Sequence, residues 1–116
     1  MVDRNERMQS PAYLALRASS RRLLRFVETE IARGGGGRVV IFDDQFAVVG
    51  SIRVVLPGIA ELKGLGLLDV ERHPKRYVCA LSDRWRSIAT PKQAMTISAG
   101  TRVQRVLPLQ SDSVSA

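Results

Sequence analysis

The sequence predicts a single α+β domain in which helices precede a small β-hairpin. Apolar residues recur at helical spacing over residues 20–33 and 52–65, and beyond Gly66 the apolar period changes to two. Between these two segments, the run VVIF at residues 39–42 predicts a short strand. A chain of 116 residues, 45% of them hydrophobic, can bury one core and is too short for two domains.

Two helices are expected in the N-terminal third of the chain. Residues 1–9 are polar, and we expect them to be disordered. Ser10 followed by Pro11 is a typical N-cap and first-turn pair, so a short helix should begin there. Ser19 is placed to cap a longer helix over residues 20–33. Its apolar face would consist of Leu23, Leu24, Phe26, Val27 and Ile31.

Turn residues divide the centre of the chain. Gly34 to Gly37 end the long helix and lead into the strand, whereas a phosphate-binding loop would need a Gly-Lys-Ser/Thr ending before a helix. Asp43 and Asp44 can cap a helix that runs to about Val49. After a tight turn, Ser51 can cap the next helix. The sequence therefore predicts two consecutive helices joined by a short turn.

The second of these helices and the hairpin after it form the most regular stretch. Pro57 lies inside the helix over residues 52–65 and should bend its first turns, because proline lacks the backbone N–H. Two alternating runs follow, at residues 68–71 and 77–81, and the basic turn 72–76 joins them. The residues expected on the buried face of the helix are Val55, Ile59, Leu62 and Leu65.

The C-terminal part carries weaker signals. Trp85 is expected at the edge of the core. Thr90 and Pro91 repeat the cap and first-turn pair, so residues 87–107 are assigned a C-terminal helix of low helix propensity. Residues 108–116 are expected to be a disordered tail. The apolar stripe of this helix is thin and consists of Met95, Val103 and Val106.

The charge balance narrows the class of partner. Lysine and arginine total 18 against 11 acidic residues, which gives a net charge of +7 and a pI near 10.7. Such values lie in the range of nucleic-acid-binding domains. The carboxylate pairs of the sequence, Asp43/Asp44 and Glu28/Glu30, have no nearby histidine or glycine-rich pocket. We therefore expect no catalytic residues.

The numbers of cysteine and histidine residues and the hydropathy of the sequence exclude other classes of protein. One cysteine, Cys79, excludes an intramolecular disulfide, and one histidine, His73, leaves no cluster for zinc. We therefore expect neither a metal nor a cofactor. No apolar run approaches the roughly 20 residues of a membrane helix, and the polar start is unlike a signal peptide. We expect a cytoplasmic protein without a membrane partner.

The order helix, helix, strand, helix, turn, helix and hairpin resembles the winged helix-turn-helix family of DNA-binding domains. The resemblance covers about residues 11–85, and we assign residues 10–86 to this domain. Its most specific part is IAELKGLGLLDV at residues 59–70, which looks like the passage from recognition helix to wing in many bacterial regulators. Small alphaproteobacterial helix-turn-helix proteins and the winged domains of plasmid replication initiators are also similar. The resemblance implies a three-helix core with a short strand and a C-terminal wing.

The resemblance also implies a function. It predicts a homodimeric transcriptional regulator or a replication accessory protein that binds double-stranded DNA, with helix 52–65 in the major groove and the wing on phosphates or the minor groove. The residues that it assigns to DNA are Ser51, Ile52, Arg53, Val54, Leu56 and Pro57 on the helix, and Arg72, Lys75 and Arg76 on the wing.

The recognition helix departs from the family pattern. Arg53 is its only charged early residue, and apolar side chains contact thymine methyl groups but cannot read donor and acceptor patterns. An alternative therefore stays open. Val54, Leu56 and Pro57 would form an exposed apolar surface that docks a protein partner.

Overall fold

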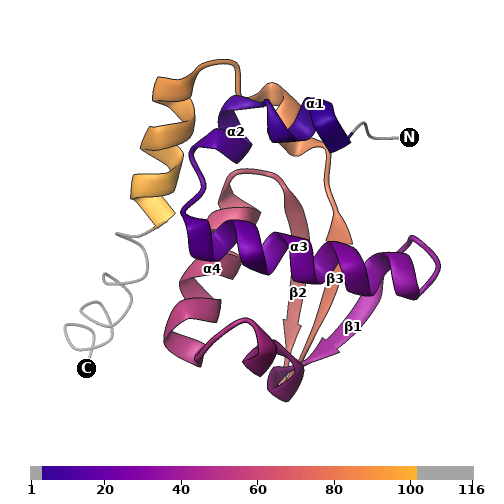
Figure 1. The fold of residues 1–116 in the computed structure, drawn as a ribbon. Coiled ribbons are helices and arrows are strands. Elements are labelled where there is room, and N and C mark those ends of the chain that lie inside the picture. Colours follow the sequence, from indigo (N-terminus) through magenta and orange to yellow (C-terminus); the bar gives the residue numbers. More distant parts are fainter. Residues whose placement is uncertain (1–3, 102–116) are drawn as a thin grey trace.

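Helices cover one face of a three-stranded antiparallel sheet in the computed structural model, which describes residues 4–101 (Figure 1). The N-terminal helices are α1 (Arg4–Met8), α2 (Pro11–Leu14) and α3 (Ala18–Arg33). Strand β1 (Val39–Phe42), the 3₁₀ helix η1 (Asp43–Val48) and α4 (Ile52–Gly64) follow. The hairpin of β2 (Leu68–His73) and β3 (Arg76–Leu81) leads to η2 (Arg84–Ser87) and to a helix over residues 91–101. The predicted α+β class is confirmed.

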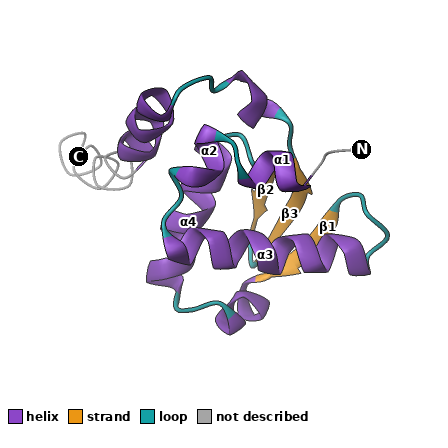
Figure 2. Ribbon diagram, turned by 45° about the horizontal axis from the view of Figure 1, so that its top comes forward, coloured by secondary structure: helices purple, strands orange, loops and turns teal. Residues whose placement is uncertain are grey.

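The sheet has the strand order β1-β3-β2 and two different faces. Ile41 lies opposite Tyr77, and both are buried with Cys79 on the face against which the helices pack. In Figure 2, α3 crosses this face. The alternate residues of β1, Val40 and Phe42, are 45% and 51% exposed on the other face. The period of two expected for the strands therefore separates a buried face from a solvated one.

The hairpin turn is tighter than expected. Residues 72–76 were all expected in the turn, but Arg72 and His73 belong to β2 and Arg76 belongs to β3. Pro74 and Lys75 alone connect the strands, and Lys75 adopts a left-handed φ of 63°. Proline fixes a negative φ at the first turn position and Lys75 supplies the positive φ at the second, which is the pattern of a type II turn.

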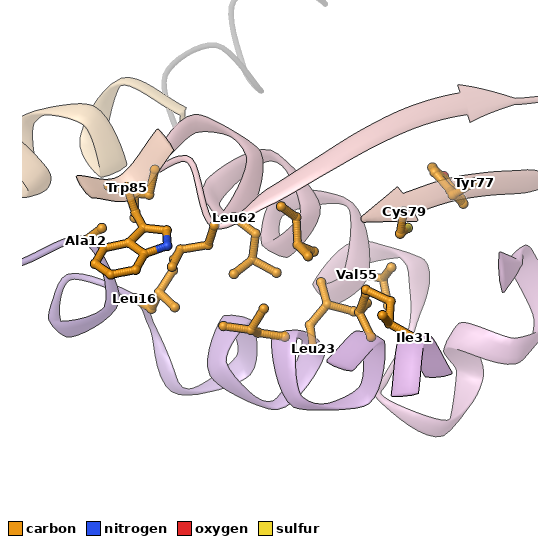
Figure 3. Close-up of a cluster of buried hydrophobic side chains, with 14 of the residues drawn as sticks. Ala12, Leu16, Leu23, Ile31, Val55, Leu62, Tyr77, Cys79 and Trp85 are labelled. Carbon is orange, nitrogen blue, oxygen red and sulfur yellow. The ribbon is translucent and has the colours of Figure 1, made fainter. Parts of the chain in front are cut away.

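A single core joins both ends of the described chain. Trp85 is 3% exposed and lies beside Ala12 and Leu16, far from it in sequence (Figure 3). Phe46 of η1 contacts the ring of Tyr77 edge-on, with 5.4 Å between ring centroids. The core positions expected on the helix over residues 52–65 are confirmed at Val55, at Leu62 and at Leu65, which is the C-cap residue of α4, and Ile59 is partly buried.

The N-terminal segment differs from the expectation. Residues 4–8 are helical, so the expected disorder of residues 1–9 is wrong there, and residues 1–3 lie outside the described part. Arg7 is 3% exposed and its guanidinium pairs with Glu28 of α3. A second pair joins Glu6 to Arg86. These partners lie 21 and 80 residues away, so no local pattern indicated them.

The helix starts are predicted with mixed success. The Ser10 hydroxyl accepts the Tyr13 N–H at 3.2 Å, which confirms the cap of α2. By contrast, α3 begins before the expected cap Ser19, and its N-cap residue is Arg17. The expected helix at Asp43 is a 3₁₀ helix rather than an α-helix, a form that is common in short segments.

The C-terminal helix packs on an unexpected face. Thr90 accepts the Gln93 N–H at 3.1 Å, which confirms the predicted start. Met95 was expected in the apolar stripe, but it is 66% exposed. The buried residues are small instead: Ala94, Ser98 and Thr101. The expected positions Val103 and Val106, and the tail 108–116, lie outside the described residues.

Candidate nucleic-acid interface

The first turn of α4 projects into solvent. Ser51 occupies the N-cap position with extended backbone geometry, as expected, although its hydroxyl makes no capping hydrogen bond. Ile52, Arg53 and Val54 are all exposed. Arg53 has no ion pair with any residue of the described chain. Four of the six helix residues assigned to DNA therefore lie on an accessible surface.

The remaining two helix residues are less accessible. Pro57 is buried, so its assignment to the DNA surface and to an exposed docking patch is wrong, and Leu56 is only partly exposed. Pro57 lies one helical turn before Glu61, which is 0% exposed, and residues four apart share a helix face. Helix α4 thus has a second buried side, where Glu61 contacts Arg17 and Ser98 and where Thr101 approaches Gly64. Sequence periodicity had indicated only one.

The tip of the β2–β3 hairpin carries accessible positive charge. Arg72, Lys75 and Arg76 are exposed, and none of the three forms an ion pair within residues 4–101. The guanidinium carbon of Arg72 lies 5.9 Å from the centre of the Tyr77 ring, which places the cation over the ring face. His73 contacts Glu71 through Nε2 at 2.7 Å. The three predicted wing cations are therefore available for phosphate contacts.

Backbone and cavity geometry connect the hairpin tip to the start of α4. The N–H of Asp43 donates to the carbonyl of Lys75 at 3.0 Å, so the tip lies against η1. A cavity of about 150 Å³ lies between η1, the first turn of α4 and β3. Its lining includes Ser51, Ile52 and Tyr77. The structure therefore brings the predicted helix site and the predicted wing site together around η1.

Two acidic residues lie at the same junction. Asp43 and Asp44 are exposed at the start of η1, where negative charge favours the helix N-terminus. Burial raises the pKa of Tyr77, the charge of Arg72 opposes that shift, and the charge of Asp43 adds to it. The positive field of the hairpin tip is thus partly neutralised on its η1 side.

Helix α4 also contains a buried carboxylate that sequence reasoning missed. Glu61 accepts the Arg17 N–H at 3.2 Å and the hydroxyl of Ser98, and it lies 3.5 Å from Nε of Arg17. Burial alone would raise the pKa of Glu61, but the nearby Ser20 hydroxyl, the hydrogen bonds from Ser98 and Arg17, and the charge of Arg17 together lower it. Glu61 therefore caps α3 and holds the C-terminal helix, a structural role that no local pattern indicated.

An exposed valine was missed as well. Val48, at the end of η1, is 83% exposed and precedes the turn into α4, where Ile52 is 55% exposed. Two consecutive valines, Val48 and Val49, directly before Gly50 would have been a usable signal, because turn positions are normally polar. The accessible apolar surface of this region is therefore formed by Val48, Ile52 and Val54.

The cysteine offers no reactive site. Burial raises the pKa of Cys79 to about 11, and the side chain is 1% exposed, so the thiolate needed for nucleophilic chemistry is scarce. Among residues 4–101, no three histidine, cysteine or acidic side chains are grouped so that they could hold a metal ion. Within the same range, no helix has the length and apolar character needed to cross a membrane.

Comparisons with protein-family models, with curated proteins and with solved structures found no match to this chain.

Proposed function

We propose that the chain is a winged helix-turn-helix protein that binds double-stranded DNA as a cytoplasmic transcriptional regulator. The single observation that carries this proposal is the exposed first turn of α4 beside a basic hairpin tip, joined through η1 by the bond between Asp43 and Lys75. The order α3, β1, η1, α4, β2, β3 supports it, because this is the order of helices and strands in that family. The net charge of +7 agrees with a polyanionic partner.

In this proposal, two elements of the chain contact the DNA. Helix α4 enters the major groove by its first turn, where Arg53 donates to a base edge and Ile52 contacts thymine methyl groups. Arg72, Lys75 and Arg76 bind phosphates and fix the register of the helix. A homodimer would place two α4 helices ~34–36 Å apart, in adjacent major grooves. Most of the affinity then comes from the wing, and the limited base specificity from Arg53.

Salt dependence of duplex binding tests the wing. The triple substitution Arg72→Ala, Lys75→Ala and Arg76→Ala should weaken binding and lower the slope of log K against log salt by about 0.9 for each lost phosphate contact. Fluorescence anisotropy with a mixed-sequence duplex between low and physiological salt measures both quantities. A matched control changes three other exposed cations, Arg22, Arg25 and Lys92, to alanine.

The control separates a site from bulk charge. The control variant removes the same net charge, but from α3 and from the C-terminal helix. Its slope of log K against log salt should differ from the wild-type slope by less than about 0.9, the value of one phosphate contact. Equal losses in both triple variants would mean that only net charge matters, and would contradict the wing assignment. A wild type that ignores duplex DNA at low salt would overturn the whole proposal.

One observation favours a second candidate, a docking surface for a protein partner. Val48 and Ile52 expose neighbouring branched apolar side chains, with exposed fractions of 83% and 55%. Under this candidate, Ile52→Asp abolishes capture of the partner, while duplex affinity at low salt is absent from the start. Under the DNA proposal, Ile52→Asp weakens duplex binding, because the contact with thymine methyl groups is lost and a negative charge enters the field of the polyanion.

A further inference from the structure

Strand β1 leaves one backbone edge without a partner strand among residues 4–101. The order β1-β3-β2 places β1 at the margin of the sheet. The N–H of Asp43 points toward the hairpin, since it bonds the Lys75 carbonyl at 3.0 Å. The N–H of Phe42 bonds Oε1 of Gln45 at 2.7 Å instead. Because backbone groups alternate along a strand, the N–H and C=O of Val40 also point away from β3.

The side chains along this edge form a self-complementary pattern. Val40 and Phe42 are 45% and 51% exposed on the sheet face that the helices do not cover. Arg38 precedes the strand and Asp44 follows it, both exposed and neither in an ion pair within the described chain. An apolar centre is thus flanked by opposite charges at its two ends.

We propose that a second copy of this chain pairs with the β1 edge in antiparallel fashion, around a two-fold axis at Val40. An antiparallel copy reverses the order of the charges, so each Arg38 meets the end that carries Asp44 in the other copy. The two-fold axis repeats this contact, and a C2 interface requires such self-complementarity. The open edge, its apolar side chains and its end charges all fit the same partner.

Gln45 determines the register of this pairing. Residues that lie opposite each other in an antiparallel pair have their side chains on the same face of the sheet. The two-fold axis must therefore pass through one residue of β1 and not between two residues. An axis at Ile41 would pair Val40 with Phe42 and would need the Phe42 N–H that Gln45 already occupies. An axis at Val40 lets the two Val40 residues exchange both backbone bonds without the Phe42 N–H. Phe42 then lies opposite the second copy's Arg38, where the Phe42 C=O can accept the Arg38 N–H while the Phe42 N–H stays with Gln45. Arg38 then lies over the second copy's Phe42 ring, with Asp44 just beyond it.

The size of the contact indicates a weak association. Strand β1 has four residues, and stable interfaces usually bury about 1,200–2,000 Å² in total. A four-residue edge buries less, so we expect dissociation constants in the micromolar to millimolar range. The test must therefore cover protein concentrations up to that range.

Sedimentation velocity of the full chain, without nucleic acid, tests the proposal. The wild type should dimerise reversibly as its concentration rises. Arg38→Glu places two acidic residues at each contact, and Asp44→Arg places two basic ones, so each variant alone should weaken the dimer about tenfold or more. An equimolar mixture of the two variants should restore association, because the introduced carboxylate of one chain then meets the introduced guanidinium of the other. Circular dichroism checks that each variant is folded.

Two further variants complete the test. Val40→Pro removes an N–H that faces away from β3, so it should abolish association while the strand still pairs with β3. Arg22→Glu, an exposed charge reversal on α3, should leave association unchanged. A monomeric wild type at every concentration, a failure of the mixture to recover association, or a dimer that Val40→Pro leaves intact would each overturn the proposal. None of these results depends on whether the chain binds DNA.

Discussion

At the scale of single residues, Glu61 shows how one buried carboxylate can connect three helices. Its side chain is 0% exposed, yet it accepts the Arg17 N–H at the start of α3 and the hydroxyl of Ser98 on the C-terminal helix. An ionised carboxylate that is buried is tolerated only when such donors surround it. The lowered pKa of Glu61 indicates that the donors outweigh the cost of burial.

This residue makes the stability of the fold depend on pH. Because the pKa of Glu61 is lower in the folded state than in the unfolded chain, its stabilising effect is complete above the ordinary glutamate pKa of about 4.3 and is lost as the pH falls through the folded value. We expect Glu61→Gln to lower the free energy of unfolding by about 1–2 kcal/mol at neutral pH and by less near about pH 3. Urea denaturation at both pH values measures the difference. Glu71→Gln, a control at a carboxylate that is 62% exposed, should change little. A constant loss for Glu61→Gln at both pH values would contradict this account.

At the scale of elements, the spacing of apolar residues predicted the regular helices and strands. It did not predict the features that depend on contacts between distant parts of the chain. The start of α4, the hairpin and the β1 strand followed from spacing and turn residues, as at Ser51 and Gly66. Pro57 and Met95 were misplaced because a helix with two buried faces, or one packed through small residues, does not produce a single apolar stripe. Of the residues predicted for the site, those of the first turn of α4 and the three wing cations are exposed, as a binding role requires. Their meeting around η1 depends on a bond between Asp43 and Lys75, which sequence could not indicate.

The corner between α4 and β2 should be the least tolerant turn in the described chain. Gly66 has φ +74°, and a Cβ there would lie 2.7 Å from backbone atoms of Arg84 and Trp85, which cannot move independently. Gly36 has φ +93° and open space around it, so it is a matched control. We expect Gly66→Ala to cost about 3 kcal/mol or more in unfolding free energy and Gly36→Ala about 1 kcal/mol. Urea denaturation of both variants gives the comparison, and equal costs would show that only the backbone conformation matters at Gly66.

At the scale of the whole molecule, the packed body extends beyond the domain 10–86 expected from the sequence. Arg7 of α1 pairs with Glu28, and Arg86 pairs with Glu6, so the N-terminal helix is attached at two points. At the other end, a Cβ on Gly64 would lie 2.6 Å from Cγ2 of Thr101, which shows how closely the C-terminal helix approaches α4. Both terminal helices therefore belong to the same body as α4.

If the C-terminal helix belongs to the cooperative unit, two adjacent substitutions should differ greatly. Ala94 is 0% exposed and Met95 is 66% exposed, so Ala94→Glu forces a carboxylate into the contact with the body, whereas Met95→Glu leaves it in water. We expect Ala94→Glu to lower the unfolding free energy by about 3 kcal/mol or more and Met95→Glu to change it by less than about 0.5 kcal/mol. Urea denaturation followed by Trp85 fluorescence is suitable, because Trp85 lies in the core outside this helix. Similar small effects of both substitutions would mean that the helix detaches without unfolding the core, and that the stability of α4 does not depend on it.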